Sequence, residues 1–125
     1  MLKILHVDDE PDIREVAAMS LGIDPDIEAR SAGSGAEALE LLESGWRPDV
    51  VLLDVMMPEL DGPGTLERIR AIPDQTDTPV IFMTARAHAQ EQSRFLELGA
   101  IAVIVKPFDP MTLARQVRDH LSSAR

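Results

Sequence analysis

The sequence contains no cysteine, no tyrosine and few other aromatic residues, and it has no long apolar run. Without cysteine, neither a disulfide framework nor a thiolate metal site is possible. The N-terminus carries one lysine and only a few further residues before the first acids, which is too short for the core of a signal peptide. Because no later apolar stretch could cross a bilayer, we expect a cytoplasmic protein without membrane contact.

Positive charge is also scarce, since 12 lysines and arginines face 22 aspartates and glutamates and leave a net charge of −10. A surface of that sign repels both the phosphate backbone of nucleic acids and anionic membranes. We therefore expect no direct binding of nucleic acid. The length of 125 residues suits one domain with a single core, and we found no internal repeat or low-complexity segment.

Four apolar runs rich in β-branched residues have the length and flanking turn formers of strands buried on both faces. A weaker strand is expected over Ile27 to Ser31, and the last helix is expected to be capped by Asp109-Pro110. Strand and helix alternate five times with short connections, which predicts an α/β fold: a parallel sheet covered by helices on both faces. The four strong runs are Leu2 to Val7, Val50 to Leu53, Val80 to Met83 and Ile101 to Val105.

Polar residues follow these strong runs at Asp8-Asp9, Asp54, Thr84 and Lys106. In open parallel sheets, ligands bind outside the carboxyl ends of the strands. Nucleotide and flavin folds place a glycine-rich turn after the first strand to cradle phosphate, whereas this turn carries three consecutive acids. Those acids would repel a bare phosphate, and they suit a hard divalent cation such as magnesium.

If the first and third strands are neighbours, Asp8, Asp9 and Asp54 converge, and their crowded like charges favour binding of a cation. Lys106 then supplies a positive charge, and Thr84 a hydroxyl donor, for phosphoryl oxygens. An aspartate can accept a phosphoryl group as an acyl phosphate, and this transfer needs mainly positioning and charge neutralisation. The residues therefore predict a magnesium-dependent aspartate phosphorylation site.

Each of these residues also has a plainer interpretation. The acids Asp8 and Asp9 could cap a helix, and Asp54 could end a strand and cap a turn. Taken alone, Thr84 is typical of a turn and Lys106 of a solvated surface. The spacing of all four groups together favours a site, because independent caps would not reproduce it. The three histidines are scattered and show no spacing typical of metal ligands.

Five short motifs in order along the chain carry a family resemblance. With them, the sequence resembles the receiver domain of two-component response regulators over nearly its whole length. The resemblance implies a doubly wound, flavodoxin-like sheet of order 2-1-3-4-5 with five helices. It also implies a single receiver domain over residues 1–125 with no output domain present. The motifs are Asp8-Asp9 with Glu10-Pro11, Leu53 to Pro58 followed by Asp61-Gly62, Thr84-Ala85, Gly99-Ala100 and Lys106-Pro107-Phe108.

The resemblance further implies a metal site and a phosphoacceptor. Asp54 is expected to accept the phosphoryl group. Asp9 and Asp54 are expected to coordinate Mg²⁺, for which Mn²⁺ can substitute, together with the backbone carbonyl of Met56. Asp8 is expected to act mainly through water.

Two further residues are implied to contact the phosphoryl group. Thr84 would report its presence, and Lys106 would pair with one of its oxygens, with a cis peptide bond between Lys106 and Pro107. The expected donor is a phosphohistidine on a histidine kinase or a phosphotransfer protein. The domain is expected to be a switch and not an enzyme, although it promotes its own phosphorylation and dephosphorylation. Its output would be a changed affinity for a downstream protein.

Three residues are expected to modify this behaviour. Receivers commonly carry a tyrosine or phenylalanine three residues before the lysine, where this chain has Val103. Val103 either enlarges an apolar patch on the face of the fourth helix, fifth strand and fifth helix, or belongs to a well-buried strand. We expect the protein to be a monomer, or a weak dimer that forms through the same face. Arg86 could reach the phosphoryl site or pair with an acid, and the Met56 side chain could limit access of water.

Two other functions stay open from the sequence. The missing aromatic at Val103 would also fit a constitutive interaction module whose pocket no longer switches. A phosphatase of the aspartyl-phosphate type uses a similar acidic nucleophile. That class has a second aspartate two residues after the first, and Met56 occupies the position here, so its general acid is missing.

Overall fold

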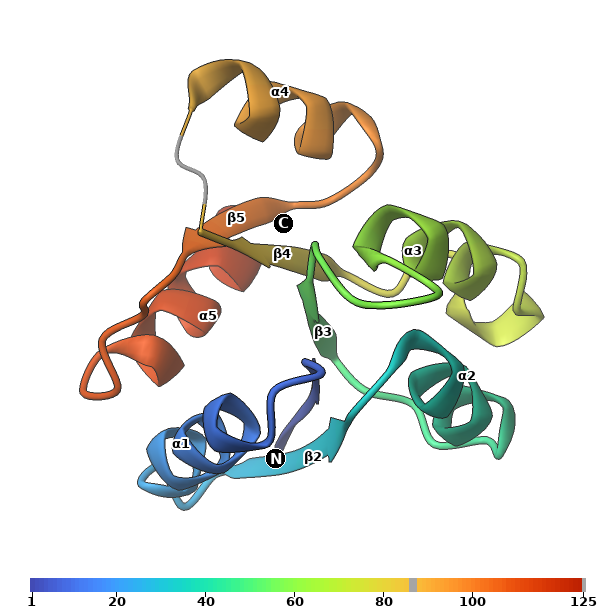
Figure 1. The fold of residues 1–125 in the computed structure, drawn as a ribbon. Helices are drawn as coiled ribbons and strands as arrows, with labels where there is room; N and C mark the ends of the chain where they lie inside the picture. Colours follow the sequence, from blue (N-terminus) through green and yellow to red (C-terminus); the bar gives the residue numbers. More distant parts are fainter. Residues whose placement is uncertain (86–87, 125) are drawn as a thin grey trace.

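A computed structural model describes residues 1–85 and 88–124 of the chain. Its centre is a parallel sheet in the order β2-β1-β3-β4-β5, with helices on both sides, as Figure 1 shows. The expected α/β fold and strand order are therefore confirmed. The strands are β1 (Leu2–Val7), β2 (Ile27–Ala32), β3 (Val50–Asp54), β4 (Val80–Thr84) and β5 (Ala102–Val105).

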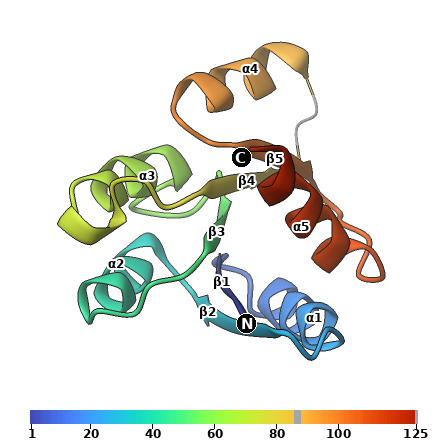
Figure 2. The same cartoon turned by 180° about the vertical axis from the view of Figure 1, so that it is seen from behind.

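Helices cover the two faces of the sheet unequally. In Figures 1 and 2, α1 and α5 lie on one side of the sheet, and α2, α3 and α4 lie on the other. A short 3₁₀ turn, η1 (Pro73–Gln75), follows α3 and was not expected. The helices are α1 (Pro11–Gly22), α2 (Gly35–Glu43), α3 (Gly62–Arg70), α4 (Ala89–Glu97) and α5 (Leu113–Ser123).

Each face of the sheet has its own apolar core. Leu5, Val7 and Phe82 belong to the core beneath α2, α3 and α4, whereas Ile4 and Met83 belong to the core beneath α1 and α5. Strands β3 and β4 are buried along their whole length, which explains their uninterrupted apolar sequence. Packing on both faces fixes the strands relative to one another, so their carboxyl ends meet at one edge of the sheet.

Helix caps follow the sequence in the middle of the chain but not at its end. Ser34 caps α2 by accepting from the backbone N–H of Glu37, as its capping-box spacing predicts. The expected start of the last helix at Asp109-Pro110 is wrong, because α5 begins at Leu113. The Asp109 side chain instead accepts from the backbone N–H of Met111 and closes a separate turn before the helix. Among the described residues, no helix combines the length and apolarity needed to span a bilayer.

Candidate functional site

Three carboxylates meet at the carboxyl edge of β1 and β3. These strands are neighbours in the sheet, with Val7 opposite Leu53. One carboxylate oxygen from each of Asp8, Asp9 and Asp54 lies within 4.8 Å of the others. Asp8 is fully buried and Asp54 is 6% exposed, so water screens their charges only weakly. The expected convergence of the three acids is confirmed.

Lys106 enters the same cluster from the end of β5. Its Nζ lies 2.7 Å from Oδ2 of Asp8 and 3.3 Å from Oδ1 of Asp54, so one ammonium group bridges two carboxylates. The backbone N–H of Lys106 donates to the carbonyl of Thr84 at 2.7 Å, which continues the pairing of β4 and β5 beyond the strands. The peptide bond between Lys106 and Pro107 is cis, as the resemblance implied.

The Asp8 carboxylate is held from both sides. Its Oδ1 accepts from the backbone N–H of Glu10 at 2.9 Å, and its Oδ2 accepts from Lys106. The backbone carbonyl of Asp8 accepts from Nη1 of Arg14 at 2.8 Å. Both carboxylate oxygens of Asp8 therefore already have donors.

The charges at the site are only partly balanced. Burial raises the pKa of Asp54, and the charge of Asp8 raises it further, although Lys106 and the backbone N–H of Met56 oppose this shift. Burial alone would lower the pKa of Lys106, but its hydrogen bond to Asp8 and the charges of Asp54 and Asp8 outweigh burial and raise it. The lysine is therefore charged at neutral pH, and the Asp54 carboxylate is less stable than a solvated one.

This donor set fits magnesium. Mg²⁺ prefers oxygen ligands at about 2.0–2.1 Å, so ligands on opposite sides of the ion lie about 4.2 Å apart. The three carboxylate oxygens lie within 4.8 Å of one another, close enough for a single ion to draw its ligands from among them. Magnesium usually keeps several waters and takes one or two protein carboxylates, which matches the half-buried position of Asp9 at the rim.

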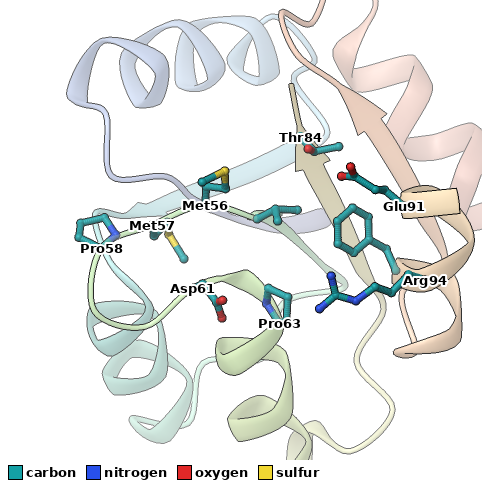
Figure 3. A pocket seen from close by; sticks show the side chains of 10 residues that line it. Met56, Met57, Pro58, Asp61, Pro63, Thr84, Glu91 and Arg94 are labelled. Atoms are coloured by element: carbon teal, nitrogen blue, oxygen red, sulfur yellow. The ribbon is translucent and has the colours of Figure 1, made fainter. Parts of the chain in front are cut away.

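A cavity of about 570 Å³ adjoins the cluster on the side of α4. Figure 3 shows the side chains of Met56 and Asp61 from the loop after β3 on one side, and Glu91 and Arg94 from α4 on the other. Thr84 lines the same cavity at the end of β4 and is 5% exposed. Since Asp54 pairs with the residue before Thr84 in the sheet, the hydroxyl-bearing residue lies beside the acidic edge.

The three residues expected to modify the site, Met56, Val103 and Arg86, differ in where the structure places them. Met56 is 70% exposed and lines the cavity. Val103 is partly buried and packs against the core that contains Phe82 and Phe95, which favours the buried-strand interpretation over the exposed patch. Arg86 lies outside the described residues, so its expected role stays a prediction.

Two residues shape the site in ways that the sequence analysis did not predict, although one of them, Gly62, belongs to the Asp61-Gly62 motif. A Cβ added to Gly62 would lie 2.5 Å from the carbonyl oxygen of Asp54 and 2.8 Å from Cα of Val55, so α3 can start against the end of β3 only with glycine there. The sequence offered one indication of this role: Gly62 directly follows Asp61, the N-cap of α3, and so stands at the first position of a helix. Arg14 gave no such signal, because its partner is a backbone carbonyl in the turn after β1.

The chain is similar to known proteins over almost its whole length. The family model of the response regulator receiver domain matches residues 4–118. The chain is 40% identical over 119 residues to a probable transcriptional regulator, ycf27, of Porphyridium aerugineum, covering 95% of this chain and 48% of that protein. It is 37% identical over 122 residues to a probable cyclic di-GMP phosphodiesterase of Vibrio cholerae, covering 98% of this chain and 27% of that protein.

A solved structure agrees with these matches. The chemotaxis response regulator CheY4 of Vibrio cholerae superposes with a TM-score of 0.87 at 31% identity, covering 96% of this chain and 98% of that one. The chain spans about half the length of the Porphyridium relative and about a quarter of the Vibrio phosphodiesterase. With its fold, its acidic edge and these matches taken together, the chain belongs to the response regulator receiver domain family, whose members are phosphorylation-dependent switches of two-component signalling.

Proposed function

We propose that Asp54 is the phosphoacceptor of this receiver domain and that its phosphorylation requires Mg²⁺, with Mn²⁺ as a substitute. One observation carries the proposal: three carboxylates from β1 and β3 converge within 4.8 Å, and Lys106 bridges two of them. Asp9, Asp54 and the backbone carbonyl of Met56 would hold the ion, with Asp8 acting through water. The bound ion would offset the negative charge of Asp54 and of the incoming phosphoryl oxygens.

The side chains of the protein carry out the phosphoryl transfer. A carboxylate oxygen of Asp54 forms the new bond to phosphorus while the bond from phosphorus to the donor imidazole breaks, and the imidazole keeps the electron pair. Lys106 pairs with a phosphoryl oxygen, and the Thr84 hydroxyl donates to another. The donor is a phosphohistidine of a histidine kinase or of a phosphotransfer protein. The domain promotes this transfer and its later hydrolysis but turns over no separate substrate.

The signal leaves by contact with a downstream protein. Leu96 and Leu98 at the end of α4 and Val105 of β5 are exposed apolar residues, and α4 and β5 are neighbours in the fold. We propose that they belong to the face formed by α4, β5 and α5. We propose that this face changes its affinity for the target when Thr84 moves toward the phosphoryl group. The domain is a monomer or a weak dimer through the same face, and residues 1–125 act as one receiver domain.

The test is phosphorylation by a small donor. Incubation of the protein with acetyl phosphate and Mg²⁺ should add one phosphate by mass spectrometry, and removal of the ion with EDTA should abolish labelling. Asp54→Asn should prevent the addition. Asp61→Asn is the matched control, since asparagine preserves the helix cap at a neighbouring acid and should label like the parent chain. Equal labelling of Asp54→Asn and the parent would refute the assignment.

A further inference from the structure

Arg14 touches the backbone of the acidic turn without entering the cluster of carboxylates. Its guanidinium Nη1 donates to the carbonyl oxygen of Asp8 at 2.8 Å, and the residue is half-buried. We infer that Arg14 is a positioning residue for the cation site, an inference that rests on the proposed function above. By holding the backbone of the turn after β1, Arg14 would orient the carboxylates of Asp8 and Asp9 toward the cation.

The Asp8 carbonyl belongs to the peptide unit that leads into Asp9. Because a peptide unit is planar, holding this carbonyl also fixes the direction in which the chain enters Asp9. The Asp8 side chain is held separately by the backbone N–H of Glu10 and by Lys106. Arg14 is thus the side-chain contact, among those described, that anchors the peptide between the two acids.

The guanidinium lies against a glycine in the loop after β2. A Cβ added to Gly33 would be 3.2 Å from Nη1 of Arg14, 3.4 Å from its Cζ and 3.3 Å from Oε2 of Glu37. Such contacts are tighter than ordinary packing, so the charged groups would have to shift by a few tenths of an ångström. The Gly33 backbone N–H also donates to Oε2 of Glu37 at 3.0 Å. Gly33 therefore leaves the space in which the guanidinium reaches Asp8.

The charge and the geometry of Arg14 make opposite contributions to cation binding. As a positive charge near the acidic cluster, Arg14 repels a dication, so its removal by electrostatics alone should tighten binding of Mg²⁺. If Arg14 instead orients the turn that carries two of the acids, its removal should weaken binding. Residues that orient metal ligands typically contribute about 10- to 100-fold in metal affinity. The direction of the change therefore separates the two roles.

The experiment measures the Kd for Mg²⁺ by calorimetry in the full chain. We expect Arg14→Met to raise Kd by about tenfold, at the low end of that range, because one of several constraints is lost. Arg14→Lys keeps a charge and a donor and should lie closer to the parent value. Arg47→Met removes the same charge from an exposed pair with Asp74 and should leave Kd unchanged. An unchanged or lower Kd for Arg14→Met would overturn the inference.

A second variant changes the geometry and keeps every charge. Gly33→Ala should raise Kd in the same direction as Arg14→Met but by less, because its Cβ would shift the guanidinium by only a few tenths of an ångström. The double variant Arg14→Met/Gly33→Ala should bind no worse than Arg14→Met alone, since no guanidinium is left to displace. Additive losses from the two changes would contradict the role of Gly33 in placing the guanidinium, because they would show that Gly33 affects the site independently of Arg14.

Two measurements separate the possible failures. Unfolding midpoints without Mg²⁺ give the fraction of each variant that is folded, so a loss of affinity in a fully folded variant is not a folding defect. If the parent chain binds no Mg²⁺, both the proposed function and this inference are refuted. Normal uptake by both the parent and Arg14→Met would remove only the role of Arg14.

Discussion

His6 is a buried imidazole directly below the acidic edge, two residues before Asp8. It is 2% exposed, and neither ring nitrogen has a hydrogen-bond partner among the described residues. Burial lowers its pKa to about 4; the charge of Asp8 opposes this shift, whereas Lys106 and Arg14 add to it. His6 is therefore neutral at physiological pH, and protonating it requires a proton to enter the core.

We expect His6→Leu to remove an acid-dependent loss of stability in the metal-free protein. The folded pKa of about 4 lies below the ordinary 6.5, so between these values the unfolded chain binds the proton first and stability falls as pH falls. The full loss is about 3 kcal/mol and is complete below pH 4. Urea unfolding at pH 7 and pH 4.5 should show a much larger fall for the parent than for the variant. Equal falls would contradict the assignment.

The residues of the site divide into those that a sequence can predict and those that it cannot. Asp8, Asp9 and Asp54 were predictable because each directly follows or ends a buried strand, and parallel strands end at the same edge. Lys106 was predictable for the same reason. Arg14 was not, because it sits on a helix surface and its partner is a backbone carbonyl, which any residue could supply.

At the scale of elements, local contacts set the helix starts described here, whereas the end of β2 depends on pairing with a distant strand. The caps Ser34 and Asp61 act within three residues, so their spacing is visible in the sequence. The start of α5 follows a turn that the Asp109 side chain closes. Helix-capping preferences predicted that the helix would begin at this acid, because a cap and a turn use the same kind of residue. The β2 strand extends to Ala32, one residue beyond the prediction, through its pairing with Val7 of β1. Distant pairing leaves no local signal.

Gly62 tests how closely α3 must approach β3. We expect Gly62→Ala to destabilise the fold by more than about 3 kcal/mol, because its Cβ would meet backbone atoms of Asp54 and Val55 at less than 3 Å. Gly22→Ala at the end of α1 is the matched control, since nothing lies within 4 Å of its added Cβ. It should be neutral or stabilise by up to about 1 kcal/mol. Thermal unfolding of both variants measures the difference, and similar midpoints would show that α3 can move away from β3.

For the whole molecule, the acidic edge connects distant parts of the chain. Asp8 and Lys106 pair across 98 positions of sequence, and Asp54 joins them from the central strand. The cluster therefore exists only when β1, β3 and β5 are assembled. Its unbalanced negative charge, within a chain of net charge −10, opposes that assembly. A ligand that neutralises the cluster binds the folded chain and not the unfolded one, so its binding stabilises the entire domain.

Mg²⁺ should therefore raise the unfolding midpoint of the parent chain. At ten times its Kd the ion adds about 1.4 kcal/mol, which corresponds to a rise of about 4–7 °C for a domain of this size. NaCl at equal ionic strength screens charge without filling the site, so it should produce a smaller rise. The pKa of Asp54 is raised and the ion binds its deprotonated form, so the Mg²⁺-induced rise should shrink as pH falls toward that pKa. A rise that NaCl reproduces, or that does not depend on pH, would mean that the ion acts by screening alone and leaves the three carboxylates unbound.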